Sequence, residues 1–462
     1  RFKNGPVAVG NSLYWDVLHL FGEVKRALAR AATEYAVDIV SVGVDTWGGD
    51  FALLSSDDSL LGNPHCYRDP RTDGMMEDVL GIIPRAEIYE RTGVQFMPFN
   101  TLYQLRAMAV QRSSQLRIAK SLLMMPDLFN FWLSGRLVCE FTDATTTQFY
   151  DPLARDWTYD LLDQLDIPAT RILPKIVEPG TVLGEMRGHL GDELGLGQIS
   201  VVAVASHDSA SAAVAVPAEA EDYAFLSSGT WSLLGAEVKE PVISEQGFAH
   251  NFSCYGGACG TFLVWKNIQG LWLLEECRRV WSVAGRDFSY DELTRMAAEV
   301  EPFGPLIDPD DPSFVAPGDM PARIRAFCRR TDQPLPDDPV EVVCCIFRSL
   351  AMKYRWVLKR LEGVVDRSLD TIHIVGGGSR NRILSQLTAD LTGRRVVAGP
   401  AEATAIGNVA VQLMALGYLA SLKEAREVVR ASFSTVLYEP SGTTAWESAY
   451  GRFCSIVGER SA

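Results

Sequence analysis

The sequence lacks the features that would identify a membrane protein, a secreted disulfide-bonded domain or a nucleic-acid-binding protein. No apolar run reaches the roughly 18 residues that span a bilayer, and no segment resembles a secretory signal. Nine cysteines in 462 residues are too few and too scattered for a disulfide scaffold. The 43 Lys and Arg are outnumbered by 58 Asp and Glu, and a net charge of −15 disfavours anionic partners. We therefore expect a cytoplasmic protein that binds neither nucleic acid nor membrane, with its oligomeric state left open.

Common nucleotide- and metal-binding motifs are missing as well. The chain contains no Gly-Lys dipeptide, so it has no Walker A loop. The glycine run at 376–378 lacks the third glycine of the dinucleotide fingerprint. The cysteines and histidines do not have the spacing of zinc ligands, so we expect no protein-bound metal and mostly reduced core thiols.

The most informative stretch that is present covers residues 201–235. Two apolar, strand-like runs each end in a small polar turn, at 206–209 and at 227–230. The first turn carries Asp208, a carboxylate that can accept a proton, and the second offers hydroxyl and backbone N–H donors to phosphate. Together they suggest phosphoryl transfer to a hydroxyl. Taken singly, Asp208 could be an ordinary helix N-cap and the second turn a tight hairpin.

Three further clusters are candidates for ligand binding. The segment 376–381 places three glycines between a strand and a helix, where the backbone can approach a nucleotide closely. The clusters at 45–48 and 68–71 combine charged residues with aromatic neighbours that could bind a polyol, although solvated loop charges are the alternative for the second. His207 could bond to a substrate hydroxyl or orient Asp208.

The hydrophobic patterning predicts an α/β protein with two related domains and a central cleft. Strands are expected at 37–44, 50–54, 371–375 and 395–397. Helices are expected at 12–35, 100–111, 127–133, 209–216, 266–280, 341–361, 381–391 and 403–416. The segment 302–339, rich in Pro and Asp, is expected to be irregular, and the acidic stretch 219–222 to be a domain junction.

These motifs resemble the FGGY carbohydrate kinases, and most closely the branch that acts on L-rhamnulose. The segments that carry the resemblance run in order from 42 to 408: VGVDTWGGDFALL, YRDPRTDG, FMPFNTLYQL, LLMMPD, TDATTTQ, VASHDSAS, LSSGTWSLLG, WKNIQGLWLL, IVGGGSRNRILSQLTADLTG and AEATAIGN. The resemblance implies two actin-like, ribonuclease-H-like domains, with an N-terminal sugar-binding domain at 1–217, a C-terminal nucleotide-binding domain at 222–432 and a tail at 433–462.

The resemblance also implies ATP-dependent phosphorylation of L-rhamnulose at its C1 hydroxyl, with Mg²⁺ carried by the nucleotide. Asp208 would be the proton acceptor. The sugar site would be lined by Gly48, His207, Asp208, Ser209 and Asn267. Contacts to ATP would come from Thr230, Gly377 and Glu275, although the family commonly has Gln at the last position, so its negative charge puts that contact in doubt.

A second departure concerns the start of the chain. The family opens with a hairpin of the type D-x-G-x-x-S-x-R that holds the terminal phosphates, and residues 1–5 look like the strand after it. We therefore expect a truncated sequence with an exposed sheet edge and impaired phosphoryl transfer. Two alternatives follow: a kinase for another ketose or deoxy sugar, such as L-fuculose or L-xylulose, or a catalytically silent sugar- or nucleotide-binding protein.

Overall fold

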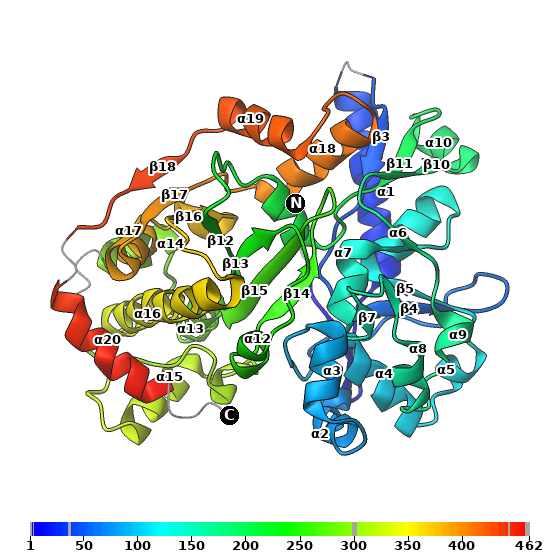
Figure 1. Cartoon of the computed structure of the whole chain (residues 1–462). Helices are drawn as coiled ribbons and strands as arrows, with labels where there is room; N and C mark the ends of the chain where they lie inside the picture. Colours follow the sequence, from blue (N-terminus) through cyan, green and yellow to red (C-terminus); the bar gives the residue numbers. More distant parts are fainter. Residues whose placement is uncertain (1, 3, 36–37, 298–302, 442–443, 458–462) are drawn as a thin grey trace.

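The computed structural model describes the whole chain except residues 1, 3, 36–37, 298–302, 442–443 and 458–462. The chain forms two α/β domains that lie side by side, the first running from blue through cyan into green and the second from green to red (Figure 1). Each domain has its own sheets and covering helices. The expected fold class, two actin-like domains with a central cleft, is confirmed.

The N-terminal domain is built on small sheets rather than one continuous sheet. Among the described residues, β3 (Ser41–Gly43) pairs in parallel only with β11 (Ser200–Ala203), which also pairs antiparallel with β10 (Thr181–Glu185). A separate antiparallel pair joins β4 (Phe51–Leu54) to β5 (Ser121–Met124). Because β3 and β11 are parallel, the turns that follow them lie at the same edge and meet over the cleft.

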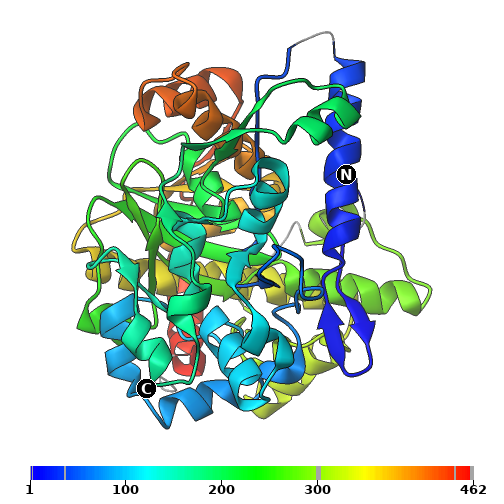
Figure 2. The same cartoon turned by 90° about the vertical axis from the view of Figure 1, so that its right-hand side faces the viewer.

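Helices and short hairpins cover these sheets. The hairpin of β1 (Val7–Val9) and β2 (Ser12–Tyr14) leads into the long edge helix α1, drawn in blue in Figure 2. The helices of the domain are α1 (Val17–Glu34), α2 (Met75–Leu80), α3 (Arg85–Thr92), α4 (Thr101–Val110), α5 (Ser114–Ile118), α6 (Met125–Ser134), α7 (Phe141–Ala144), α8 (Tyr159–Asp163), α9 (Ala169–Ile172), α10 (Gly188–Leu194) and α11 (Asp208–Val214). The remaining short strands are β6 (Cys139–Glu140), β7 (Tyr150–Asp151), β8 (Asp156–Trp157) and β9 (Ile176–Val177).

The C-terminal domain contains a seven-stranded mixed sheet. Its order is β14 (Ser253–Gly256), β15 (Phe262–Gln269), β13 (Trp231–Val238), β12 (Tyr223–Ser228), β16 (Thr371–Val375), β17 (Arg395–Ala398) and β18 (Val436–Tyr438). The pairs β12–β16 and β16–β17 are parallel and the others antiparallel. The helices are α12 (Glu245–Ala249), α13 (Trp272–Val283), α14 (Tyr290–Met296), α15 (Met320–Arg330), α16 (Pro339–Val365), α17 (Arg382–Thr392), α18 (Ala403–Ala415), α19 (Leu422–Ser432) and α20 (Thr444–Val457).

Two helices bring the domains together above the cleft. α11 of the first domain packs directly on α18 of the second. The contact is so close that a Cβ added at Gly407 would lie 1.8 Å from the backbone oxygen of Ser211. Ser41 and Gln412 are joined across the same interface by a hydrogen bond of 2.8 Å. The turn after β11 is thus fixed from both domains.

Most of the expected elements are present, with three errors. The helix expected at 12–35 is wrong in its first part, because residues 12–14 form β2 and α1 begins only at Val17. The helix expected at 266–280 is wrong in its first part, because β15 continues to Gln269 and α13 begins only at Trp272. The segment 302–339 contains the 11-residue helix α15, although Pro302 itself lies outside the described residues. The strand expected at 37–44 is shorter, with Val37 outside the described residues. The proposed domain boundaries stay predictions.

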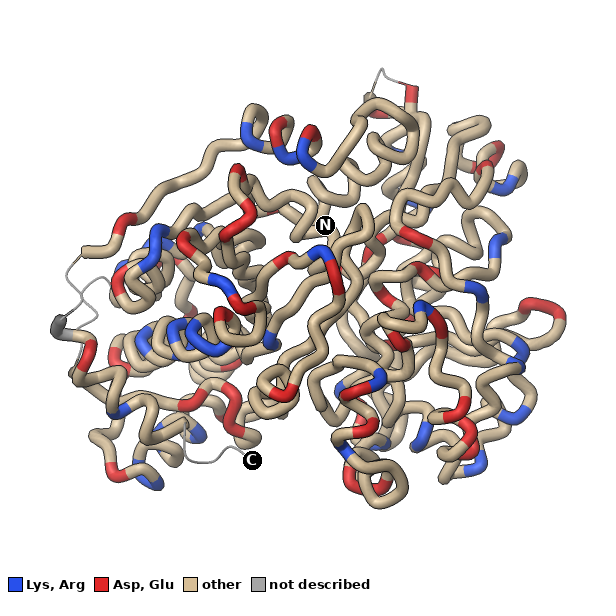
Figure 3. The backbone as a smooth tube through the Cα atoms, in the orientation of Figure 1, with Lys and Arg blue, Asp and Glu red and all other residues tan. Residues whose placement is uncertain are grey.

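Charged residues of both signs are interspersed over the two domains (Figure 3). All nine cysteine thiols are free, and six of them are buried. In the part of the chain that the structure describes, no helix has the length and apolarity to cross a bilayer.

Candidate active site

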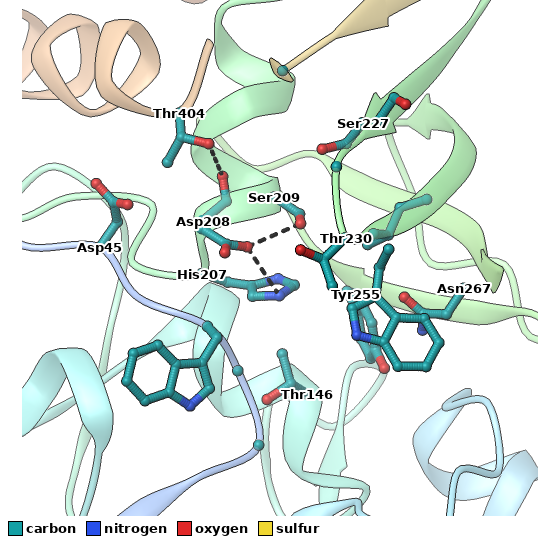
Figure 4. A pocket seen from close by; sticks show the side chains of 18 of the residues that line it. Asp45, Thr146, His207, Asp208, Ser209, Ser227, Thr230, Tyr255, Asn267 and Thr404 are labelled. Atoms are coloured by element: carbon teal, nitrogen blue, oxygen red, sulfur yellow. Dashed lines mark hydrogen bonds and ion pairs between the residues drawn. The ribbon is translucent and has the colours of Figure 1, made fainter. Parts of the chain in front are cut away.

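A cavity of about 510 Å³ lies between the two domains. Figure 4 shows it from close by, with Thr404 and Ser227 on one side of Asp208 and Thr146 and Asn267 on the other. Residues from the turns after β3 and β11 line it together with residues from the β12–β13 turn, β15 and the start of α18. The two polar turns that the sequence suggested as partners therefore face one cavity.

Asp208 lines this cavity because it is the first residue of α11, which follows the short turn after β11 ends at Ala203. Its backbone N–H donates to the Thr46 oxygen at 2.8 Å, which ties the turn to the end of β3. Its carboxylate accepts a hydrogen bond from the Ser209 hydroxyl at 3.0 Å. The side chain is 44% exposed, so the carboxylate can reach a bound hydroxyl while its backbone is held.

His207 lies beside Asp208, with its Nε2 3.7 Å from the Asp208 carboxylate. Burial lowers the pKa of His207, and the charge of Asp208 only partly opposes this, so the imidazole is neutral at pH 7. Its buried Nδ1 has no hydrogen-bond partner among the described residues. A neutral imidazole here can exchange a hydrogen bond with a substrate hydroxyl.

The buried carboxyl group of Glu140 fixes the backbone of the turn that precedes Asp208. The backbone N–H of Ser206 donates to Glu140 Oε2 at 2.9 Å, and the His207 N–H donates to the Thr142 hydroxyl at 3.1 Å. That hydroxyl in turn donates to Glu140 Oε2 at 2.5 Å. Burial raises the pKa of Glu140 to about 8. The backbone of the turn is therefore fixed independently of any ligand.

Asp45 is a second carboxyl group in the cavity, at the end of β3. Its Oδ2 accepts a hydrogen bond of 2.5 Å from the Asn408 amide of α18. Burial, with a smaller contribution from the charge of Asp208, raises the pKa of Asp45 to about 7. Two carboxylates that disfavour each other's charge can be stabilised by a hard divalent cation. Among the described residues, no group of three or more acidic, His or Cys side chains lies close enough together to hold a metal ion.

The phosphate-binding candidates form one end of the cavity. The β12–β13 turn presents Gly229 and Thr230, and the turn after β16 presents Gly376 and Gly377. These turns touch: a Cβ at Gly378 would lie 2.0 Å from the Ser228 hydroxyl oxygen. Gly376 and Gly378 are therefore required for the two loops to approach each other, whereas a Cβ at Gly377 would meet nothing within 4 Å.

Aromatic and amide side chains form the other end. The rings are those of Trp47, Tyr67, Phe99, Trp231 and Tyr255, and the polar groups include Asn100, Thr146 and Asn267. The Asn267 side chain and backbone N–H both donate to the Gln95 amide oxygen, at 3.2 and 2.9 Å. An aromatic surface with a few fixed amides is typical of a site for a small polyol.

Every site residue predicted from the sequence lines this cavity except Glu275. The structure brings together Gly48, His207, Asp208, Ser209, Asn267, Thr230 and Gly377. Glu275 lies on α13, does not line the cavity and pairs with Arg278 at 3.2 Å. Its contact with ATP stays a prediction.

The cluster at 68–71 can be interpreted from sequence either as polyol ligands or as solvated loop charges, and two of its charged residues fit neither. Asp69 and Arg71 are buried and do not line the cavity, so they are neither polyol ligands nor solvated loop charges. Sequence reasoning assigned no role to Glu140, Thr404 or Asn408. Thr404 and Asn408 lie in the segment AEATAIGN, and Thr142, which bonds to Glu140, begins the segment TDATTTQ. These two segments were the sequence signals that could have indicated the three residues.

Comparison with known proteins identifies the family of the chain. The model for the N-terminal domain of the FGGY family of carbohydrate kinases matches residues 11–215, and the model for its C-terminal domain matches residues 224–416. A rhamnulokinase of Bacteroides thetaiotaomicron is 42% identical over 457 residues, which is 99% of this chain and 93% of that protein. A rhamnulokinase of Pectobacterium carotovorum is 42% identical over 460 residues, 99% of this chain and 90% of that protein.

Solved structures show the same fold at lower identity. A ligand-bound xylulose kinase from Lactobacillus acidophilus aligns with a TM-score of 0.80 at 18% identity, covering 98% of this chain and 91% of that one. A xylulose kinase from Rhodospirillum rubrum aligns with a TM-score of 0.81 at 16% identity, covering 99% and 92%. With both family models matched and relatives above 40% identity, the chain belongs to the FGGY family of carbohydrate kinases.

Proposed function

We propose that this kinase transfers the γ-phosphoryl group of ATP to the C1 hydroxyl of L-rhamnulose, giving L-rhamnulose 1-phosphate and ADP. The observation that carries the proposal is the place of Asp208, between an aromatic, amide-lined end of the cavity and a glycine-rich end that suits phosphates. The rhamnulokinases that match almost the whole chain indicate which ketose occupies the first end.

In the proposed reaction Asp208 accepts the proton of the C1 hydroxyl. The C1 oxygen forms a bond to the γ-phosphorus, and the bond from that phosphorus to the β–γ bridging oxygen breaks, so that ADP leaves with the bonding pair. His207 and Asn267 hold sugar hydroxyls, while the glycine turns and Thr230 contact the nucleotide. Positioning and electrostatic stabilisation account for most of the rate in such reactions.

Mg²⁺ would be bound with ATP, and Asp45 is the residue best suited to hold it, because its buried carboxyl group faces Asp208 across the cavity. The ion would neutralise charge on the transferred phosphoryl group. The hydrogen bond from Asn408 orients the Asp45 carboxyl group toward the cavity.

A coupled ADP-release assay with L-rhamnulose, L-fuculose and L-xylulose tests the proposal. We expect L-rhamnulose to have the highest kcat/KM and NMR of the product to show phosphate on C1. A higher kcat/KM for another ketose would assign the chain to a sister activity. Binding of ATP and L-rhamnulose in calorimetry without any ADP release would instead identify a silent binding protein.

A further inference from the structure

The aromatic end of the cavity is assembled from three segments that are distant in sequence. Trp47 follows β3, Tyr67 lies in the loop before α2, and Phe99 lies two residues before the start of α4. The Tyr67 and Phe99 rings are 5.3 Å apart, and the Phe99 and Trp231 rings are 5.9 Å apart. We call Trp47, Tyr67 and Phe99 the aromatic wall. In the described part of the chain, no strand pairing joins Trp47, Tyr67 and Phe99 to one another.

A fully buried carboxylate behind the wall holds two of these segments. Asp50 Oδ2 accepts hydrogen bonds from the Trp47 indole N–H at 2.9 Å and from the Tyr67 backbone N–H at 3.1 Å. The Trp15 indole N–H donates to the same oxygen at 2.6 Å, and the Trp15 and Trp47 rings are 4.3 Å apart. Asp50 does not line the cavity and so acts only through the residues it holds.

The Gln104 amide extends this support to the third segment. Its Nε2 donates to Asp50 Oδ1 at 3.0 Å, to the Phe99 backbone oxygen at 3.0 Å and to the Gly49 backbone oxygen at 3.0 Å. Its oxygen accepts a hydrogen bond of 2.6 Å from the Arg71 guanidinium. Arg71 is buried against Asp69 and supplies the positive charge opposite Asp50.

We propose that Asp50 and Gln104 are positioning residues that fix the aromatic wall and so set the selectivity of the kinase for a ketose whose end opposite C1 is a methyl group. The inference rests on the proposed function. With C1 at Asp208, the far end of the sugar meets rings rather than carboxylates. A rigid apolar wall favours a methyl group, while a loosened one admits a hydroxymethyl group and its water more easily.

L-rhamnulose and L-fructose form a matched pair for the test, since they differ only by CH₃ or CH₂OH at C6. The measured quantity is the ratio of kcat/KM for the two sugars at saturating ATP. The wild type is expected to prefer L-rhamnulose by on the order of 10²-fold. Absence of activity toward both sugars would contradict the proposed function and not this inference.

The decisive variant is Asp50→Asn, which keeps the shape of the side chain. Because all four partners are N–H donors, the new amide NH₂ must face at least one of them. We expect the selectivity ratio to fall at least about fivefold, mainly through a higher KM for L-rhamnulose, with kcat within about threefold. Trp47→Phe, which keeps a ring but removes the N–H, should lower the ratio similarly, and the double variant should show less than the summed effect.

Asp390→Asn is the matched control. Asp390 is also buried and accepts hydrogen bonds from Ser441 and Gln386, but it lies on α17, away from the cavity. It should lower Tm without changing the ratio. A ratio within twofold of wild type in folded Asp50→Asn would overturn the inference, as would an equal change in the control. If Asp50→Asn does not fold, an unchanged ratio in both Trp47→Phe and Gln104→Met would overturn it.

Discussion

At the scale of single residues, the proposed reaction depends on a carboxylate whose backbone is fixed while its side chain stays accessible. Asp208 is held through its N–H and through the neighbouring Ser206 and His207 amides, so little reorganisation is needed when a hydroxyl binds. A base in this position contributes only by removing a proton as the oxygen attacks.

Asp208→Asn removes that base with minimal change in shape. We expect kcat to fall by about 10²–10⁴-fold, with KM for ATP within about threefold, because the nucleotide contacts lie elsewhere. Steady-state kinetics with L-rhamnulose gives both values. Asp16→Asn is the control, since Asp16 also begins a helix but does not line the cavity, and it should leave both values unchanged. Turnover within tenfold of wild type would contradict the role of Asp208.

The raised pKa of Asp45 leads to a prediction about how the stability of the protein depends on pH. Its pKa is raised from the ordinary 3.8 to about 7, so the folded state holds a proton that the unfolded state has lost. The stabilising contribution is complete below 3.8 and disappears as the pH rises through about 7. The free energy of unfolding of the wild type minus that of Asp45→Asn should therefore decrease with pH over this window, with a slope of up to about 1.4 kcal/mol per pH unit.

Urea unfolding of both proteins between pH 4.5 and 8 measures that difference. Subtracting the variant removes the other titrating groups, including His65 and His373, whose pKa values burial lowers to about 4 and which act in the opposite direction. A difference that does not change with pH would show that Asp45 is not titrating near neutrality.

Seven of the eight site residues predicted from the sequence line the cavity, and each of the seven occurs in a short, distinctive segment. Their roles stay predictions. The partners of these residues could not be predicted. Asp45 and Asn408 are 363 residues apart, and only the packing of α18 on α11 makes them neighbours. Likewise, nothing in the sequence around Asp50 indicates that its carboxylate holds Tyr67 in place.

At the scale of secondary-structure elements, the error at 266–280 has an identifiable cause. Trp265, Ile268, Leu271 and Trp272 are spaced as on one face of a helix, yet the first two belong to a central strand and the last to α13. The break falls at Gly270, where a Cβ would lie 2.7 Å from the Ser232 hydroxyl oxygen. Periodicity alone cannot separate a buried strand from a helix over so few residues.

The packing of α18 on α11 leads to a prediction at this scale. Gly407→Ala would place a methyl group 1.8 Å from the Ser211 oxygen, so the helices must separate. We expect a loss of stability of about 1–3 kcal/mol. We also expect a lower kcat, because α11 begins with Asp208. Urea unfolding and steady-state kinetics measure the two effects.

Gly451→Ala is the matched control, since Gly451 also lies in a helix but has no neighbour within 4 Å of an added Cβ. It should be neutral or stabilising, because alanine favours helix. If Gly407→Ala were as stable and as active as the control, α11 and α18 would not be as closely packed in solution.

At the scale of the whole molecule, the cavity lies between the two domains, and we expect these to close over sugar and nucleotide and so exclude water. Arg68 connects the domains beside the aromatic wall. Its guanidinium lies 4.5 Å from the centre of the Trp272 ring, and its Nη1 donates to the Val315 backbone oxygen at 3.1 Å. Both partners belong to the C-terminal domain, while Arg68 is next to Tyr67 in the N-terminal domain.

Arg68→Ala removes this connection without changing any residue that lines the cavity. A stacked guanidinium and one hydrogen bond together contribute about 1–2 kcal/mol, so KM for L-rhamnulose should rise about five- to thirtyfold while the protein stays folded. Small-angle X-ray scattering with both substrates bound should give a larger radius of gyration than wild type. Arg395→Ala, which removes an exposed ion pair within the C-terminal domain, should change neither quantity. If KM and the radius of gyration were unchanged in Arg68→Ala, the contacts of Arg68 would not contribute to domain closure.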